Sequence, residues 1–93
     1  MSIKDALELK PFTTKTPSGL EITVRRPNTL DLIEAIEVSK STPDKFGAWL
    51  VFNHLQENGT QVFANLDEVL QCDVSLVDEI ASVVEKLYGE GKN

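Results

Sequence analysis

Apolar positions are densest between Thr42 and Gly59, a stretch that holds the only Trp and two of the four Phe residues. At about 100° per residue, apolar side chains would cover most of the circumference of a helix here. Thr42 can cap its first turn, Pro43 suits the first helical position, and Asn58-Gly59 can end it. A helix that is apolar nearly all round needs cover on two sides, so we expect it to be central or to leave one side for a partner.

Residues 10–26 predict a β-hairpin. From Leu20 to Arg25, apolar and polar residues alternate, which places Leu20, Ile22 and Val24 on one face of a strand. The sequence Pro17-Ser18-Gly19 before it has the composition of a turn. Because a two-stranded hairpin is not stable alone, its apolar face must lie on helices or its strands must pair with another chain.

The next helix is predicted to start at Asn28, whose side chain can cap it while Asp31 reaches back to complete a capping box. Leu30 falls outside its apolar stripe and can act as a local staple or as a partner-binding residue. Val38 also falls outside the stripe. The stripe consists of Leu32, Ile33, Ala35 and Ile36, opposite Asp31, Glu34 and Glu37.

The last third of the chain predicts a short extended segment and two helices. Residues 60–63 can form an edge strand or place their apolar side chains in the core. Asn65 can cap a short helix that ends near Cys72. Ser75 opens the final helix, which we expect Gly89 to end. Its apolar stripe contains Leu76, Val77, Ile80, Val83, Val84 and Leu87, with Tyr88 at the edge.

Together these elements predict an α+β fold, in which an N-terminal β-hairpin packs on a small bundle of three to four helices. With 93 residues, the chain is expected to form a single domain, residues 1–93. Residues 1–9 can be loose or can form a short helix capped by Ser2, and residues 89–93 are expected to be flexible. The core is modest at this length, so self-association or a larger partner is expected to complete it.

The charge and the cysteine content narrow the range of partners. The net charge of −6, from 15 acidic and 9 basic residues, argues against binding to nucleic acid or to an anionic membrane. No apolar run approaches the roughly 20 residues that span a bilayer, and no secretion signal is recognisable. One Cys cannot form an internal disulfide, which suits a cytoplasmic location.

The residues that could carry chemistry do not predict an enzyme or a cofactor. His54 is the only His, and we interpret it as a partly buried residue with one satisfied nitrogen. Cys72 is interpreted as a small apolar residue at a helix end. A metal site needs more ligands than these two, and no flanking motif supports a Cys–His nucleophile pair. The glycines occur singly, so no phosphate-binding loop is predicted.

A protein-binding surface is the remaining possibility. Gly47, inside the most apolar helix, can permit close approach of a neighbouring element or be simply tolerated. Phe52 can be an exposed aromatic anchor or a core residue. The pair Arg25-Arg26 can bind an acidic partner or remain solvated. The candidate partner-binding residues are Arg25, Arg26, Leu30, Val38, Trp49 and Phe52.

Several of these pieces occur together in a known family. A lead-in ending in Pro11-Phe12 precedes the hairpin Thr16–Pro27, which runs directly into the acidic and aliphatic helix Asn28–Ala35. An apolar helix and a C-terminal Leu/Val/Ile helix follow, in a small acidic chain. This order resembles the tail assembly chaperones of tailed bacteriophages, especially those encoded between the tail tube and tape measure genes of contractile-tailed phages. The strongest part of the resemblance is the junction from Gly19 to Ala35.

The resemblance implies a role without a catalytic site or cofactor. Such chaperones bind the long tape measure protein in the host cytoplasm and keep it soluble until the tail tube polymerises around it. They are absent from the mature virion, and many are also made in a longer, frameshifted form. The implied partners are the tape measure protein, the tail tube protein and further copies of the chain. The alternative interpretation is a small acidic inhibitor, similar to an antitoxin, that blocks a basic surface of an enzyme.

Overall fold

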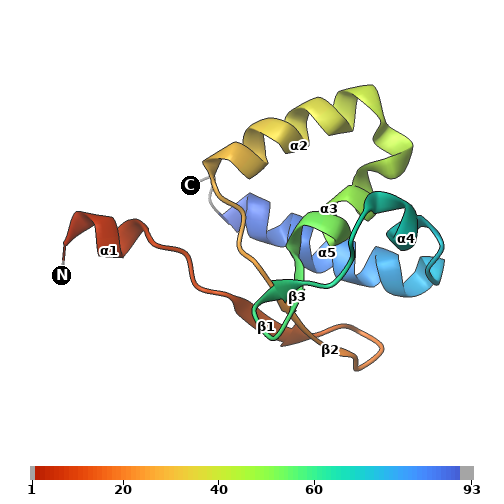
Figure 1. Ribbon diagram of the computed structural model, residues 1–93, viewed down its shortest axis with the longest axis horizontal. Coiled ribbons are helices and arrows are strands. Elements are labelled where there is room, and N and C mark those ends of the chain that lie inside the picture. The colour runs from red at the N-terminus through yellow and green to blue at the C-terminus, as the bar shows by residue number, and fades with distance from the viewer. Residues whose placement is uncertain (1, 91–93) are drawn as a thin grey trace.

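The structure is a computed structural model that describes residues 2–90, and it confirms the α+β class. A four-stranded antiparallel sheet lies below a cluster of helices, and one further helix stands apart from the body (Figure 1). The helices are α1 (Ile3–Leu7), α2 (Thr29–Ser41), α3 (Phe46–His54), α4 (Leu66–Leu70) and α5 (Val74–Glu90), with the short 3₁₀ helix η1 (Pro43–Lys45). The strands are β1 (Phe12–Lys15), β2 (Glu21–Val24), β3 (Leu55–Glu57) and β4 (Thr60–Gln61).

The predicted hairpin is confirmed as β1 and β2, in a register that places Phe12 opposite Val24. Gly19 provides the positive φ of 93° that the connecting turn requires. Ile22 and Val24 are buried as expected, whereas Leu20 precedes the strand and is exposed, contrary to the prediction. The tip of the hairpin is fixed to the helices by Glu79, because its carboxylate accepts a 2.8 Å hydrogen bond from the Ser18 backbone N–H.

The predicted helix from Thr42 to Gly59 begins where expected, with Pro43 as the first residue of η1 leading directly into α3, but its predicted cap and its predicted end are wrong. Thr42 closes α2, since its hydroxyl and its backbone N–H both donate to the Val38 carbonyl, and it makes no cap for the following turn. At the other end the chain leaves the helix after His54 and continues as β3. The residues Asn58 and Gly59, both with positive φ, form the turn between β3 and β4. An Asn-Gly pair is also a strong hairpin signal, and the open edge of β2 decides between the two outcomes.

The β3–β4 hairpin extends the sheet to the order β1-β2-β3-β4. β3 pairs with β2 through Leu55 opposite Val24 and Gln56 opposite Thr23. The segment 60–63 is therefore an edge strand at its start, while Phe63 beyond it is half-buried and packs against the core. The expected edge strand therefore forms, whereas only Phe63 reaches the core, because Val62 is exposed.

The helix α3 is central, as predicted for the apolar stretch. It packs on α5, α4 and α2 and continues directly into the sheet. At its crossing with α5, a side chain at Gly47 would place its Cβ 3.6 Å from the Cβ of Ala81, an ordinary van der Waals distance. The buried apolar core consists of Ile22, Val24, Ala48, Leu50, Val51, Val69, Ile80, Ala81, Val84 and Leu87.

The two C-terminal helices are confirmed with shifted ends. In α4 the Asn65 side chain accepts from the Glu68 backbone N–H, as predicted. The helix α5 starts before Ser75, since the carboxylate of Asp73 accepts from the Leu76 N–H. It also continues through Gly89 to Glu90, so the predicted stop at Gly89 is wrong. The flexibility predicted for residues 91–93 concerns residues outside the described part.

The first two helices start as the sequence suggested, but the inward face of α2 differs from the prediction. Ser2 caps α1 by accepting from the Asp5 N–H, so residues 3–7 take the helical alternative. In α2 the capping box of Asn28 and Asp31 is confirmed. Its predicted apolar stripe is wrong, however, because the inward-facing residues of α2 are Asp31 and Ala35. The apolar side chains left largely exposed on α2 are Leu30, Leu32, Ile33 and Ile36.

Gly47 allows a direct test of the α3–α5 crossing. Replacement of Gly47 by Ala should leave the free energy of unfolding unchanged or raise it by up to about 1 kcal/mol, because Ala is the better helix former and its Cβ fits at 3.6 Å. Replacement by Leu should lower it, because the larger side chain would overlap the Ala81 side chain of α5. Urea unfolding of the two variants and the native chain measures both effects. Equal stability of the Ala and Leu variants would show that the helices do not cross closely here.

Candidate partner-binding surface

Arg25 and Asp31 form a two-pronged ion pair that connects the end of β2 to the first turn of α2. The two guanidinium nitrogens donate to the two carboxylate oxygens, at 2.5 Å and 3.1 Å. The second nitrogen also donates to the Asn53 carbonyl near the end of α3, at 2.9 Å. Asp31 accepts further from the backbone N–H of Asn28, at 2.8 Å. The pair therefore holds three elements together.

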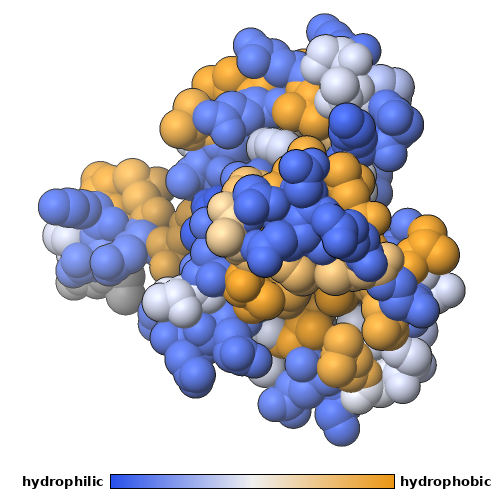
Figure 2. Space-filling view, turned by 45° about the vertical axis from the view of Figure 1, so that its right-hand side comes forward, coloured by the Kyte–Doolittle hydropathy of each residue, from blue (hydrophilic) through white to orange (hydrophobic). Residues whose placement is uncertain are grey.

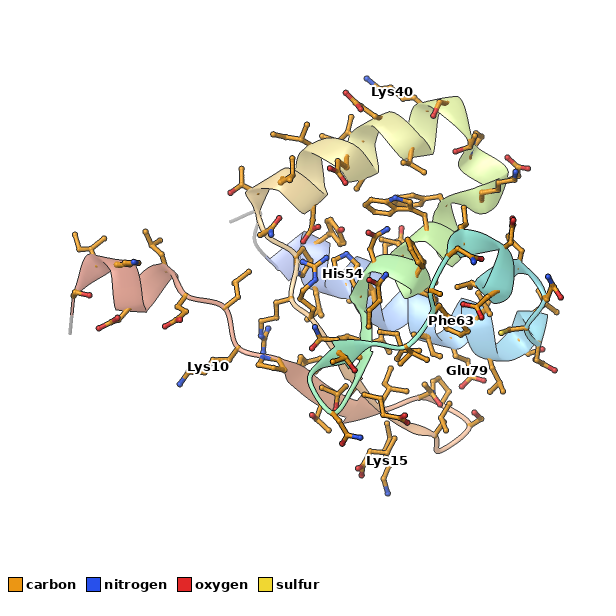
Figure 3. The ribbon with its side chains drawn as sticks, viewed as in Figure 1. Lys10, Lys15, Lys40, His54, Phe63 and Glu79 are labelled. Atoms are coloured by element: carbon orange, nitrogen blue, oxygen red, sulfur yellow. The ribbon has the colours of Figure 1, made fainter. Side chains whose placement is uncertain are left out.

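His54 lies at the point where α3, α5 and the sheet meet (Figure 3), and it is completely buried. Its Nδ1 is 2.9 Å from the carbonyl oxygen of Arg25, and its Nε2 is 2.6 Å from the hydroxyl of Tyr88 on α5. Since a carbonyl can only accept, Nδ1 carries the proton and Nε2 accepts from Tyr88. Both nitrogens are thus satisfied, where the sequence had suggested one.

Burial and charge set the protonation of this network. Burial lowers the pKa of His54, and the nearby charge of Arg25 lowers it further, so the imidazole is neutral. Burial by itself would raise the pKa of Asp31, but the hydrogen bonds from Arg25 and the Asn28 backbone outweigh it and the pKa is lowered. The hydrogen bond to Asp31 raises the pKa of Arg25. Burial raises the pKa of Tyr88, so its hydroxyl stays protonated and can donate to His54.

These contacts occupy the two arginines predicted to bind a partner. Arg25 is committed to Asp31 and Asn53 inside the molecule. Arg26 lies over the ring of Phe12, 5.0 Å from its centroid, and its Nε donates to the Lys10 carbonyl. Both side chains therefore have structural roles that explain their presence without a partner.

The aromatic candidates lie at the margin of the core. Trp49 is half-buried and stacks on Phe46, with ring centroids 6.2 Å apart. Phe52 is half-buried and packs against the core, between the two outcomes expected for it. Val38 is also half-buried. Leu30 is 59% exposed, so it is not a packed staple. Cys72 follows the end of α4, at a helix end as interpreted, and its side chain is exposed.

A groove of about 350 Å³ runs between α2 on one side and α3 and α5 on the other. Its α2 wall is formed largely by Leu32 and Ile36, and Tyr88 connects the opposite wall to the buried network through His54. The remaining lining residues are Ala35, Ser39, Phe46, Glu85 and Gly89. This groove is the feature of the molecule best suited to receive an apolar ligand or segment.

The apolar surface continues from the groove over α2. Leu30 and Ile33 lie on the same helix and are both more than half exposed. Figure 2 shows this surface: apolar patches lie among polar residues over α2, at the top of the molecule. Lys40, in contrast, points away from the body at the outer side of the helix (Figure 3). The structure thus gives α2 a largely exposed apolar surface, while Asp31 and Ala35 face the body.

The groove residues were not predicted as a site. The spacing of Leu32, Ile33, Ala35 and Ile36 predicts an apolar stripe, and such a stripe normally faces a core. One signal is present in the sequence: α2 also carries Leu30 and Val38 outside the stripe, so its apolar side chains extend around more of the helix than one core face requires. A second was Tyr88, placed at the edge of the final stripe.

Other kinds of site find no support in the described part of the chain. Within residues 2–90, no three His, Cys, Asp or Glu side chains gather as metal ligands would. None of the described helices has the length and apolar character needed to cross a membrane. Comparisons of the chain with models of protein families, with curated proteins and with solved structures give no match.

The ion pair predicts a marked asymmetry between two carboxylates of α2. Replacement of Asp31 by Asn should lower the free energy of unfolding by about 1–3 kcal/mol, because Arg25 and the Asn28 N–H lose a charged acceptor in a partly buried site. Replacement of the exposed Glu34 by Gln is the matched control and should change it by less than about 0.5 kcal/mol. Chemical denaturation measures both. Equal losses would contradict the structural role of the pair.

The lowered pKa of His54 predicts destabilisation on mild acidification. In the unfolded chain its pKa is about 6.5, so below that pH the unfolded state binds a proton that the folded state resists. The free energy of unfolding should therefore be highest above about pH 6.5 and fall as the pH decreases through the lower pKa of the folded state. Asp31, whose folded pKa is also lowered, adds a second loss below about pH 4.

Denaturation curves recorded at several pH values test this prediction. The matched variant, His54→Gln, should be less stable at neutral pH but should lack the first decrease and keep the second. If the native chain and the variant showed the same pH dependence between about pH 7 and pH 5, His54 would not be the responsible group.

Proposed function

We propose that the protein is a tail assembly chaperone of a tailed bacteriophage, which binds the tape measure protein in the host cytoplasm and keeps it soluble until the tail tube forms around it. In this proposal the chaperone is displaced before the virion matures. Two grounds support the proposal: the resemblance of the Gly19–Ala35 junction to this family, and the open apolar groove between α2 and α5.

The groove supports this role because it suits an amphipathic helix. Helix-in-groove recognition places apolar residues, spaced three or four positions apart, against an apolar channel. Leu32 and Ile36 are themselves one helical turn apart along the wall, and Phe46 contributes an aromatic surface opposite them. A long helical client such as a tape measure protein would offer many segments with the required spacing.

The charge of the chain supports the same role. Glu85 belongs to the groove lining, and Glu34 and Glu37 are exposed on α2. These carboxylates favour a client segment that has basic residues beside its apolar face. The net charge of −6 would help to keep a complex of an aggregation-prone client in solution. In this proposal the tail tube protein is the partner that replaces the chaperone on the client.

The distribution of acidic residues favours a chaperone over an inhibitor of a basic surface. An inhibitor requires its carboxylates to gather on one face. Here they come from all parts of the fold: Asp5 from α1, Glu21 from β2, Glu37 from α2, Glu57 from β3 and Glu79 from α5. The acidic residues therefore spread over the molecule, as expected if they serve mainly solubility.

Co-expression with the tape measure protein of the same genome tests the proposal. The native chain should keep that protein soluble and co-elute with it in size-exclusion chromatography. Ile36→Asp should weaken binding about tenfold or more, since it places a charge on the groove wall. Val62→Asp is the matched control, because Val62 is 43% exposed and Ile36 47%, but it lies outside the groove.

Two outcomes of this experiment would contradict the proposal. If the tape measure protein stayed insoluble with the native chain, the chaperone role would be excluded for this client. If both variants retained binding equally, the client would be held by another surface. Circular dichroism of each variant verifies that the helices are intact.

A further inference from the structure

The helix α1 forms an arm whose apolar residues have no cover in their own chain. Ile3 is 80% and Leu7 75% exposed, and no residue of α1 is buried. Figure 1 shows the arm standing clear of the body, and Figure 2 shows its apolar side beside a polar one. Since Ile3 and Leu7 are one turn apart, they form a single apolar edge.

An arm of this kind requires a surface to bind. Five helical residues form little more than one turn, and isolated helices shorter than about 12–15 residues are marginal in water. The Ser2 cap assists the turn but cannot replace tertiary packing. The helix α1 therefore needs its apolar edge buried against another apolar surface to be stable.

The root of the arm is anchored and limits how far the arm can move. Lys10 is fixed to the body, because its carbonyl accepts from the Nε of Arg26, which itself lies over Phe12. Pro11 then restricts Lys10 to an extended conformation. Only Glu8 and Leu9 remain between the end of α1 and this fixed point, and two residues reach about 7 Å at most.

The groove between α2 and α5 complements the arm. Its α2 wall presents Leu32 and Ile36 at the same four-residue spacing as Ile3 and Leu7, the arrangement in which rows of side chains on two helices interlock. The charges also agree. Lys4 lies next to the apolar edge of the arm, and Glu85 belongs to the groove lining.

We propose that the α1 arm of one copy binds in the α2–α5 groove of a second copy. The inference does not rest on the phage client, because it follows from two exposed apolar surfaces of the chain itself, the edge of α1 and the α2–α5 groove. The interface is small. An arm spanning residues 2–9 and a groove of eight lining residues fall short of the roughly 20–30 residues per side of a standard interface. The association is therefore reversible and depends on protein concentration.

Disulfide trapping between different chains tests the proposal. In a Cys72→Ser background, a chain with Leu7→Cys is mixed with a chain carrying Ile36→Cys and oxidised under mild conditions. A covalent mixed dimer should form several-fold faster than when the Leu7→Cys chain is mixed with one carrying Val62→Cys. Val62 has nearly the same exposure as Ile36 but lies outside the groove. Equal rates would overturn the proposal.

A chain carrying both Leu7→Cys and Ile36→Cys distinguishes the remaining possibility. If it closed on itself as a monomer while the mixture of single variants gave no dimer above the control, the arm would occupy its own groove and the proposal would be wrong.

Light scattering on the full chain provides an independent measurement. The mean mass of the native protein should rise with concentration, and Leu7→Asp should require at least about a tenfold higher concentration for the same rise. Val74→Asp, a change at an apolar residue on α5 that is 72% exposed against 75% for Leu7, should behave as the native chain. A native chain that stayed monomeric at millimolar concentration would contradict the proposal. Because no client is present, these results are independent of the co-expression experiment.

Discussion

The ion pair between Arg25 and Asp31 determines where α2 lies, and the rest of the surface depends on that position. The pair joins the residue that follows β2 to the first turn of α2, and through Asn53 it also reaches the end of α3. Asp31 completes the capping box at the same time, so one carboxylate fixes both the start and the orientation of the helix. With α2 held at this end and through η1 at the other, its middle can stand off from α5 and leave the groove open.

His54 serves the same purpose from within the core. It has no contact with solvent, and its two nitrogens connect the Arg25 carbonyl to the Tyr88 hydroxyl. A neutral histidine can do this because it is a donor at one nitrogen and an acceptor at the other. The groove wall at Tyr88 is thereby tied to the ion pair that positions the opposite wall. The only histidine in the chain thus has a structural role and needs no catalytic explanation.

Predictions from sequence succeeded where the cause was local. The β1–β2 hairpin, the capping box at Asn28 and the start of α4 depend on residues within a few positions of one another, and all were confirmed. Predictions failed where a distant partner decides. The apolar segment ending at Leu55 suits a helix or a strand equally, and only the free edge of β2 selects the strand. Similarly, Asp31 faces inward because it pairs with Arg25, six residues earlier. With Asp31 inside, the apolar side chains of α2 are left exposed along the groove.

The direct passage from α3 into β3 has a consequence for how this chain can change during evolution. No loop separates His54 from Leu55, so helix and strand share one continuous register. One inserted residue there would rotate the helix by about 100° relative to the strand and turn every strand side chain to the opposite face. The connection at residues 71–73 is exposed and carries no such constraint, whereas the two-residue turn at Asn58-Gly59 fixes the register of β4 on β3. Length variation among descendants of this chain should therefore accumulate at the connection around Cys72, while the distance from Trp49 to Gln56 stays fixed.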